Sequence, residues 1–237
     1  MTRMFPFVSR RRWRLQPPFG WVRFGSFARR QPISDCFGYD RGTPINRYYI
    51  DRFLGDHAGD ITGRVLEIGD AAYTTRFGAG RVARSDVLHV DPAAAQATIC
   101  GDLVSGRGVP DACFDCVILT QTLHLLYDVR AALATVERSL APGGVLLATM
   151  PGITRISRPE MDRWGDSWRF TSYSARRLFE ETFGSRIDIA AYGNVLAAVS
   201  FLQGLAAEEL SAADLDHYDR DFEVTIGIRA RKEGGAA

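Results

Sequence analysis

RVLEIG, residues 64–69, is a short apolar run that carries one acid, Glu67, and ends in glycine. Such a run is typical of a strand buried on both faces of a sheet. Four similar runs follow it, at residues 86–90 (DVLHV), 97–100 (ATIC), 114–120 (FDCVILT) and 145–150 (VLLATM). A helical pattern, expected to span residues 122–140, separates the last two and stops before Pro142-Gly143-Gly144. The alternation predicts an α/β fold with a parallel sheet and helices on both faces.

The flanking regions predict the rest of the organisation. Residues 174–183 and 195–210 have helical patterns, and residues 187–192 and 222–231 read as strands. Before the core, Thr43 and Pro44 are typical of a helix start and predict a helix through Leu54. Residues 1–42 show no regular pattern. We therefore expect an N-terminal arm, residues 1–42, and one domain, residues 43–237.

Charge is unevenly distributed along the chain. The net charge is +1, which argues against general attraction to nucleic acid or to a membrane. Between Met1 and Ile33, however, there are eight arginines and no acid. Such an arm suits an anionic acceptor, a membrane surface or another subunit, and it equally suits a solvated tail.

The sequence predicts a cytoplasmic protein without a bound metal. No run approaches the ~20 apolar residues of a membrane span, and the arginines interrupt any secretory signal. Cys113 and Cys116 form a C-x-x-C, but a zinc site needs four ligands and no second close pair exists. Reduced thiols in a cytoplasmic protein are the better interpretation.

Polar or small residues stand where each predicted strand ends. Glu67 and Gly69 close the first strand, Asp91 the second and Asp102 the third. Thr120 and Gln121 close the fourth strand. Ligands of doubly wound sheets bind outside the carboxyl ends of the strands, so we expect these residues to share one site.

In this order, VLEIGD, VLHVDP, ICGDL, FDCVILTQTLHLLYD and LAPGGVLLATMP resemble the motifs of class I S-adenosylmethionine (SAM)-dependent methyltransferases, in particular the type 11 branch. The resemblance covers residues 64–151. It implies a Rossmann-like, mainly parallel seven-stranded sheet whose last strand is antiparallel. It also implies SAM as the cofactor and methyl transfer as the activity.

The resemblance assigns roles to the residues at the strand ends. Glu67 is expected to accept hydrogen bonds from the methionine ammonium, directly or through water, and Gly69 to let the backbone approach the ligand. Asp91 is expected to bind the ribose hydroxyls. Asp102 and the main-chain N–H of Leu103 are expected to face the adenine, although Asp102 also suits a turn. Thr120 and Gln121 complete the predicted cofactor site.

Two features depart from the family pattern. Ala71 and Tyr73 stand where glycines are usual, and alanine is tolerated there only if its φ is negative. Tyr73 must turn aside and is predicted to wall the cofactor or acceptor pocket. In addition, only residues 92–101 separate Asp91 from Asp102, so the usual helix should be reduced to a turn.

The acceptor side is predicted from fewer residues. His124 lies just beyond the fourth strand, where it is either a general base or a polar residue of the following helix. Trp164, Trp168 and Arg169 are predicted to form an acceptor lid, with core packing as the alternative for the tryptophans. Tyr39, Arg41 and Tyr48 suit either closure over the cofactor or plain packing.

The function predicted from the sequence is methylation of a small molecule, favoured at oxygen. The fourth motif lacks N/D-P-P-Y/F, which argues against methylation of nucleic-acid bases. Two alternatives remain open. One is a non-catalytic member that binds SAM or a partner. The other is a nucleotide-dependent oxidoreductase, although the loop lacks the G-x-G-x-x-G that seats a pyrophosphate. The sequence does not predict an oligomeric state.

Overall fold

The computed structural model of the chain describes residues 17–235, in two units that divide between Pro32 and Ile33. The described part of the first unit contains one 3-10 turn, η2 (Gly25–Phe27). Just before it, the Trp21 N–H donates to the Pro18 carbonyl at 2.9 Å. The arginines at positions 3 to 14 lie outside the described residues.

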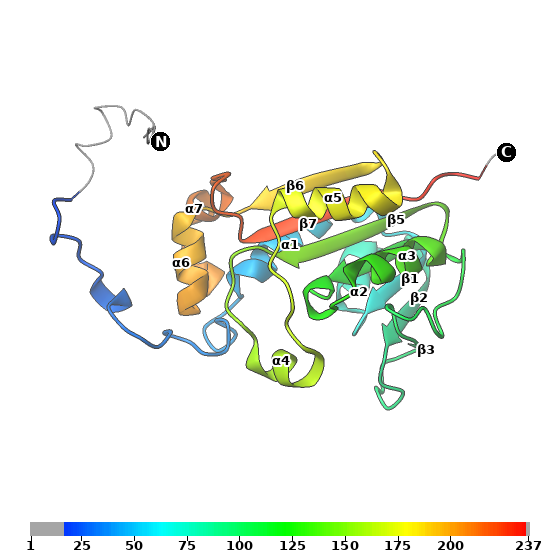
Figure 1. Cartoon of the computed structure of the whole chain (residues 1–237), viewed down its shortest axis with the longest axis horizontal. Helices are drawn as coiled ribbons and strands as arrows, with labels where there is room; N and C mark the ends of the chain where they lie inside the picture. Colours follow the sequence, from blue (N-terminus) through cyan, green and yellow to red (C-terminus); the bar gives the residue numbers. More distant parts are fainter. Residues whose placement is uncertain (1–16, 236–237) are drawn as a thin grey trace, which may run out of the picture. The chain divides into compact units, whose positions relative to one another are not determined.

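The second unit is built on one seven-stranded sheet with the order β3-β2-β1-β4-β5-β7-β6 (Figure 1). Its strands are β1 (Gly63–Ile68), β2 (Val82–His89), β3 (Ile99–Cys100), β4 (Phe114–Thr120), β5 (Leu140–Pro151), β6 (Ile187–Tyr192) and β7 (Thr225–Arg231). Strands β1 to β5 pair in parallel, and β7 runs antiparallel to both β5 and β6. The predicted seven-stranded α/β fold with an antiparallel last strand is confirmed.

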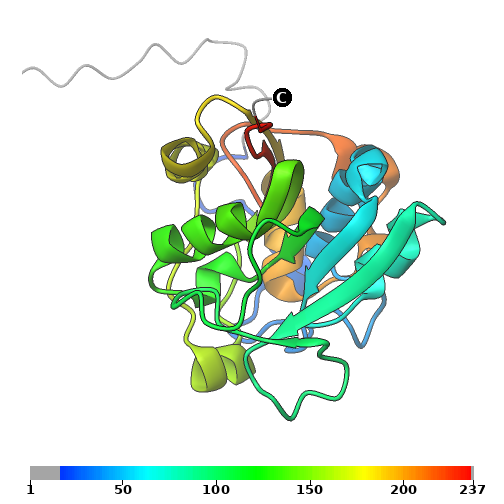
Figure 2. The same cartoon turned by 90° about the vertical axis from the view of Figure 1, so that its right-hand side faces the viewer.

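Helices cover both faces of this sheet (Figure 2). Helices α3 (Val129–Ser139) and α5 (Ser172–Phe183) pack on one face, and α1 (Ile45–Asp56) and α2 (Ala72–Gly78) on the other. Val117 of β4 joins the cluster formed with α3 and α5, while its neighbours Cys116 and Ile118 join the cluster formed with α1. Successive side chains of a strand point to opposite faces of the sheet. Since helices cover both faces, the side chains on both must be apolar. This explains why the strands are almost continuously hydrophobic.

Cys116 belongs to this apolar packing. Its side chain is fully buried, and burial raises the pKa of its thiol. A buried thiol behaves as a small hydrophobe.

A glycine in β7 sets the position of α1 on the sheet. A Cβ built on Gly227 would lie 2.4 Å from a ring carbon of Phe53. The missing side chain therefore lets the Phe53 ring lie directly on the strand. This contact fixes α1, and with it the residues that α1 presents at the end of the sheet.

The prediction of one helix over residues 122–140 is wrong. A 3-10 turn, η4 (Leu123–Leu125), comes first, and α3 begins only at Val129, with the Asp128 carboxylate accepting from the Ala131 N–H. The His124 carbonyl accepts from the N–H groups of Ser167 and Trp168. These tertiary hydrogen bonds use a carbonyl that a continuous helix would need for itself.

The C-terminal part also differs in detail from the sequence prediction. The helix expected over residues 195–210 is divided into α6 (Val195–Gln203) and the 3-10 turn η5 (Ala207–Glu209). Two short helices, α4 (Arg158–Trp164) and α7 (Ala212–Asp216), were not predicted. Between Asp91 and Ile99 only turns connect β2 to β3, as predicted.

Residues 33–42 are grouped with the second unit rather than with the arm. The N–H groups of Ile33 and Ser34 both donate to the Gln203 carbonyl at the end of α6. A Cβ on Gly204 would lie 2.3 Å from the Ser34 carbonyl oxygen, so this segment runs close along the end of α6. The division between arm and domain at residues 42 and 43 stays a prediction.

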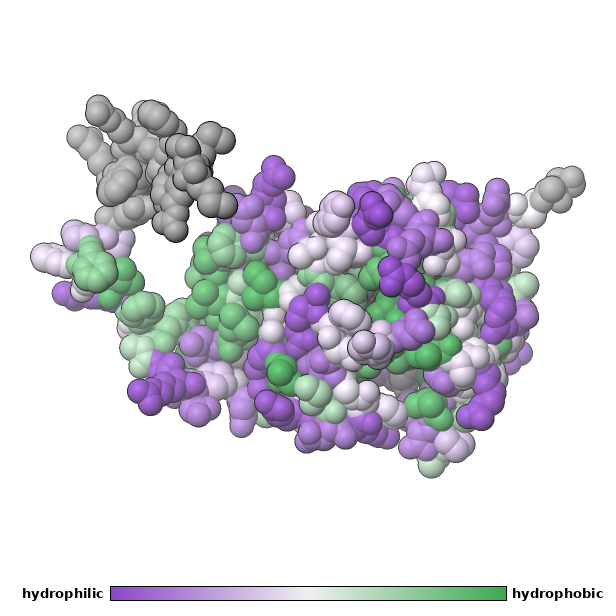
Figure 3. Space-filling model, in the orientation of Figure 1, coloured by the Kyte–Doolittle hydropathy of each residue, from purple (hydrophilic) through white to green (hydrophobic). Residues whose placement is uncertain are grey.

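The outer side of α6 is apolar (Figure 3). Val195, Leu196, Val199 and Leu202 are each between 38% and 51% exposed, and together they form one stripe along the helix. None of the helices in residues 17–235 combines the length and apolar character needed to cross a membrane.

Candidate functional site

Gly69, directly after β1, has the backbone conformation that the predicted site requires. Its φ is +92°, which disfavours any residue with a Cβ, and a Cβ placed there would have no atom within 4 Å. The glycine therefore faces open space rather than a packed neighbour. Ala71, with φ −115°, needs no glycine, as expected.

Glu67 is buried beneath the start of α2. One carboxylate oxygen accepts from the Tyr73 N–H at 3.1 Å, and the other accepts from the N–H and hydroxyl of Thr74, both at 2.7 Å. Burial raises the pKa of this carboxyl, while the Thr74 and Tyr73 hydrogen bonds oppose that rise. Both oxygens are thus engaged within the protein, where they hold the loop around Gly69 against α2.

Tyr73 turns aside toward α1, as its size requires. Its hydroxyl accepts from Arg47 Nη1 at 2.7 Å, and its ring stacks near Phe77. Arg47 also donates from Nε to the hydroxyl of Tyr39 at 2.9 Å. Tyr73 is therefore linked through Arg47 to the segment that precedes α1.

Asp91 lies at the end of β2, next to α4. Its Oδ1 accepts from the Ala93 N–H at 2.9 Å, while Oδ2 lies 3.5 Å from Arg163 Nη2. His89 Nδ1 accepts from the Asp91 N–H, and the His89 ring meets Trp164 edge to face at 6.1 Å. Two residues of α4 thus contact the end of β2.

Asp102 is engaged in its own turn. Its two oxygens accept from the N–H groups of Val104 and Ser105 and from the Ser105 hydroxyl, and these bonds lower the pKa of the carboxyl. The turn role foreseen for Asp102 is present in the structure. Over the described residues, the N–H of neighbouring Leu103 has no recorded protein acceptor.

Thr120 is the last residue of β4, at the centre of the sheet, and Gln121 follows it. Gln121 has φ +47°, a conformation that non-glycine residues rarely adopt and that often marks a functional position. Its N–H donates to the Thr149 carbonyl of β5 at 2.9 Å. The strained backbone directs the Gln121 side chain into the cavity described next.

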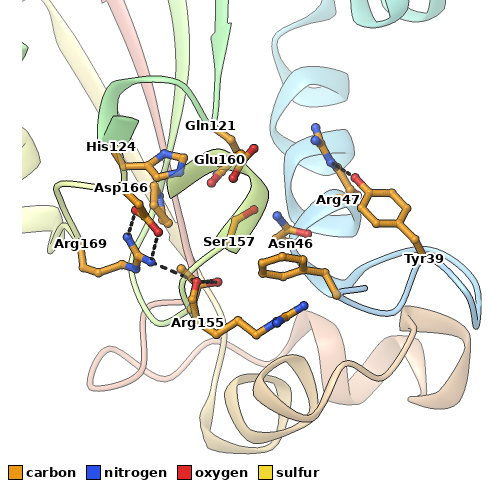
Figure 4. Close-up of a pocket in the computed structure, with 13 residues that line it drawn as sticks. Tyr39, Asn46, Arg47, Gln121, His124, Arg155, Ser157, Glu160, Asp166 and Arg169 are labelled. Atoms are coloured by element: carbon orange, nitrogen blue, oxygen red, sulfur yellow. Dashed lines mark hydrogen bonds and ion pairs between the residues drawn. The ribbon is translucent and has the colours of Figure 1, made fainter. Parts of the chain in front are cut away.

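A cavity lies beside these strand ends, within the second unit (Figure 4). Its lining residues come from the segment before α1 and the first turn of α1, from the end of β4 and η4, and from the end of β5 and the segment that leads to α5: Phe37, Tyr39, Asn46, Arg47, Gln121, His124, Pro151, Thr154, Arg155, Ser157, Glu160, Asp166 and Arg169. Glu160 belongs to α4, the helix whose Arg163 contacts Asp91. The end of β2 and the cavity therefore share one helix.

His124 is the only histidine that lines this cavity. It is 6% exposed, and its Nδ1 is buried without a hydrogen-bond partner among the described residues. Burial lowers the pKa of the imidazole to about 4, against the opposing effect of the nearby Asp166 carboxylate. At neutral pH the ring is uncharged and has one nitrogen free to accept a proton.

Only part of the predicted acceptor lid reaches the cavity. Arg169 lines it and donates to both oxygens of Asp166. Trp164 packs on His89, and Trp168 donates from Nε1 to the Leu126 and Tyr127 carbonyls while stacking on Tyr127. Trp168 lines a second groove between α3 and α5 instead.

Of the lead-in residues, Tyr39 lines the cavity but Arg41 and Tyr48 do not. Arg41 pairs with Glu209, and Tyr48 donates to Asp216. The sequence also missed Arg47, Arg155, Glu160 and Asp166 as cavity residues. Arg47 could have been predicted from the sequence, since it is a charged residue in the first turn of a helix that follows Thr43 and Pro44.

Comparison with known proteins agrees with this architecture. A family model described as a methyltransferase domain matches residues 68–148. No curated protein sequence matches the chain. The match confirms the resemblance to class I methyltransferases that the ordered motifs indicate.

Solved structures of low sequence identity share the fold. A SAM-dependent methyltransferase from Archaeoglobus fulgidus is 11% identical, with a TM-score of 0.52 over 78% of this chain and 94% of that chain. The N-methyltransferase NodS from Bradyrhizobium japonicum, in complex with S-adenosylhomocysteine, is 17% identical, with a TM-score of 0.51 over 85% and 94%. The [4+2]-cyclase SpnF is 20% identical, with a TM-score of 0.51 over 82% and 85%. At these identities the likeness concerns the fold alone.

Proposed function

We propose that the protein binds SAM at the ends of β1, β2 and β4 and methylates a small molecule held beside His124, as the match of residues 68–148 to a methyltransferase domain model supports. The observation that carries the proposal is Gly69, which has a positive φ and faces open space where a side chain would stand. A ligand can approach the backbone closely there. The cavity with His124 lies next to the same strand ends.

The strand-end residues divide the work of binding the cofactor. Asp91 offers its Oδ2 to the ribose hydroxyls, and the free N–H of Leu103 suits the adenine ring. Glu67 acts mainly by holding α2 and the loop around Gly69, because its oxygens are already engaged. Thr120 and Gln121 lie at the end of β4, and Gln121 also lines the cavity. SAM supplies a methyl group that is already activated on a sulfonium.

His124 is the group placed to handle a proton. The uncharged imidazole has one unprotonated nitrogen, which can accept the proton that an acceptor hydroxyl loses as it is methylated. This favours oxygen as the methylated atom. Tyr73, Trp164 and Trp168 act indirectly, since they position Arg47, His89 and the backbone beside His124.

Calorimetry with SAM, S-adenosylhomocysteine and NAD tests the proposal. Micromolar binding of the first two is expected, on the order of −8 kcal/mol, and none of NAD. Asp91→Ala should weaken both ligands by about 1.5–3 kcal/mol, because hydrogen bonds to a charged acceptor are lost. Asp188→Ala, which removes an exposed acid from β6, is the matched control and should leave both affinities unchanged.

Three results separate the alternatives. NAD binding without SAM binding would indicate an oxidoreductase. SAM binding with no transfer to hydroxyl or amine compounds would indicate a non-catalytic member of the fold. Unchanged SAM affinity in folded Asp91→Ala would place the ribose elsewhere.

A further inference from the structure

The cavity beside His124 carries more positive than negative charge. Three arginines line it, Arg47, Arg155 and Arg169, against two acids, Glu160 and Asp166. Arg169 is neutralised by Asp166 through two hydrogen bonds. Over the described residues, neither Arg47 nor Arg155 is paired with a carboxylate.

The two unneutralised arginines differ in what holds them. Arg47 donates from Nε to the Tyr39 hydroxyl and from Nη1 to the Tyr73 hydroxyl, so two of its three nitrogens have protein partners. Arg155, on the loop after β5, lies over the Phe37 ring, with its guanidinium carbon 3.9 Å from the ring centroid. One Nη donates to the Asp35 carbonyl. The stacking and this bond fix the orientation of the guanidinium.

Arg155 nevertheless has an unused donor. Its Nε is buried and has no hydrogen-bond partner among the described residues. A buried donor without a partner is unfavourable, and the half-exposed guanidinium has no carboxylate as a counter-charge among the described residues. An oxyanion satisfies both needs at once, because the guanidinium fork matches the geometry of a carboxylate or a phosphate.

The polar groups on the other side of the cavity have a different character. His124 and Glu160 offer proton-accepting atoms, whereas Arg155 offers only donors (Figure 4). The cavity volume is about 170 Å³, so a compact ligand would reach both sides. A ligand that fits carries an acid group at one end and a hydroxyl at the other.

We propose that the methyl acceptor is an anionic small molecule whose carboxylate or phosphate is bound by Arg155 while its hydroxyl lies at His124. This proposal rests on the proposed function, since it assigns the cavity to the acceptor. The same chemistry has a second possible source, because the methionine part of SAM also carries a carboxylate. The test must therefore distinguish an acceptor anion from a cofactor anion.

The test uses inorganic phosphate as the probe and the full chain saturated with S-adenosylhomocysteine. Binding is measured by broadening of the phosphate ³¹P resonance, which detects weak complexes, and SAM affinity is measured separately by calorimetry. Arg155→Gln should weaken phosphate binding at least tenfold and change SAM affinity less than twofold. Arg158→Gln, an exposed arginine of the same segment, is the matched control and should bind phosphate like the wild type.

Other outcomes overturn the proposal. No phosphate binding to the wild type, or equal binding to Arg155→Gln, would remove the anion site. A parallel loss of SAM affinity in Arg155→Gln would assign the anion to the cofactor.

The experiment also covers two further cases, a variant that does not fold and a wild type that binds phosphate but not SAM. If Arg155→Gln does not fold, Arg155→Lys keeps the charge but loses the fork, and a three- to tenfold loss of phosphate binding is expected. Unchanged binding in Arg155→Lys would then contradict the proposal. If the wild type binds phosphate through Arg155 but binds no SAM, the proposed function fails while the anion site stands.

Discussion

The edge of the sheet where the parallel strands end, and the cavity beside it, differ in how far their polar groups are satisfied within the protein. At the edge, Glu67 accepts three hydrogen bonds from α2, and Asp102 accepts three from its own turn. At the cavity, His124 Nδ1 and Arg155 Nε are buried without partners in the part of the chain that the structure describes. Groups of the first kind stabilise the fold whether or not a ligand is present. Groups of the second kind lower stability and favour a ligand that completes them.

The comparison predicts that substitutions at the edge change stability and substitutions in the cavity change activity. The largest effect is expected for His124→Ala. Turnover should fall about 10²–10⁴-fold, equivalent to roughly 3–5 kcal/mol, because the proton acceptor is lost. SAM affinity, measured by calorimetry, should stay nearly unchanged.

The pH profile gives a second measure of His124. The wild-type kcat/KM should lose activity only near pH 4, the pKa of the buried ring, rather than near 6.5. That acidic limb should disappear in His124→Ala. Turnover within a few-fold of wild type would contradict a catalytic role of His124 and leave it as a structural residue.

Glu67→Ala should mainly destabilise the fold. Removing a buried carboxylate leaves two backbone N–H groups and the Thr74 hydroxyl without acceptors, at about 2–4 kcal/mol of the free energy of unfolding. Urea unfolding measures the change. Asp70→Ala removes an exposed acid that accepts one N–H nearby, and its effect should stay below about 1 kcal/mol. Equal effects of the two substitutions would contradict the assignment.

The dependence of stability on pH should show the unsatisfied state of His124. The folded ring has a pKa of about 4, whereas the ordinary value is 6.5, so the unfolded chain binds a proton first as the pH falls. Stability is therefore fully present above pH 6.5 and decreases between pH 6.5 and 4, by about 3 kcal/mol in total. Unfolding of wild type and His124→Gln at several pH values measures the difference. Parallel pH profiles for the two proteins would show that the ring is not held uncharged.

The smallest effect is expected for Asp102→Ala, which removes the acceptor of the turn at residues 102–105. A loss of about 1 kcal/mol in the free energy of unfolding is expected, as for a lost cap. SAM affinity should change little if the Leu103 N–H is the main contact to the adenine. A loss of affinity as large as that of Asp91→Ala would instead assign Asp102 to the ligand and not to the turn.

The sheet was predictable because each strand is a local apolar run bounded by turn residues. β6 matches the expected residues 187–192, and the acids at the strand ends lie where the motifs place them. The break before α3 was not predicted, although Asp128 is a strong N-cap. The helical pattern of the sequence continues through residues 122–128. In the structure, the distant Ser167 and Trp168 donate to the His124 carbonyl, which a continuous helix would need.

Most of the cavity could not be predicted from the sequence, again because it depends on contacts between residues that are distant along the chain. Phe37, Arg155 and Asp166 come from irregular segments far apart along the chain, and no spacing rule connects them. Their meeting depends on tertiary packing, such as the Arg155 guanidinium lying on the Phe37 ring. A sequence motif identifies residues that one strand and its following turn hold in place. This cavity, in contrast, is lined by three separate parts of the chain.

The contact between α4 and the end of β2 has a consequence for the order of events in a catalytic cycle. Arg163 lies against Asp91 and Trp164 against His89, while Glu160 of the same helix lines the cavity. A cofactor bound at Asp91 would therefore lie beside a helix that also borders the cavity. We expect the methylated product to leave first, and the spent cofactor to exchange only after α4 has moved. The off-rate of S-adenosylhomocysteine should then depend on the movement of α4.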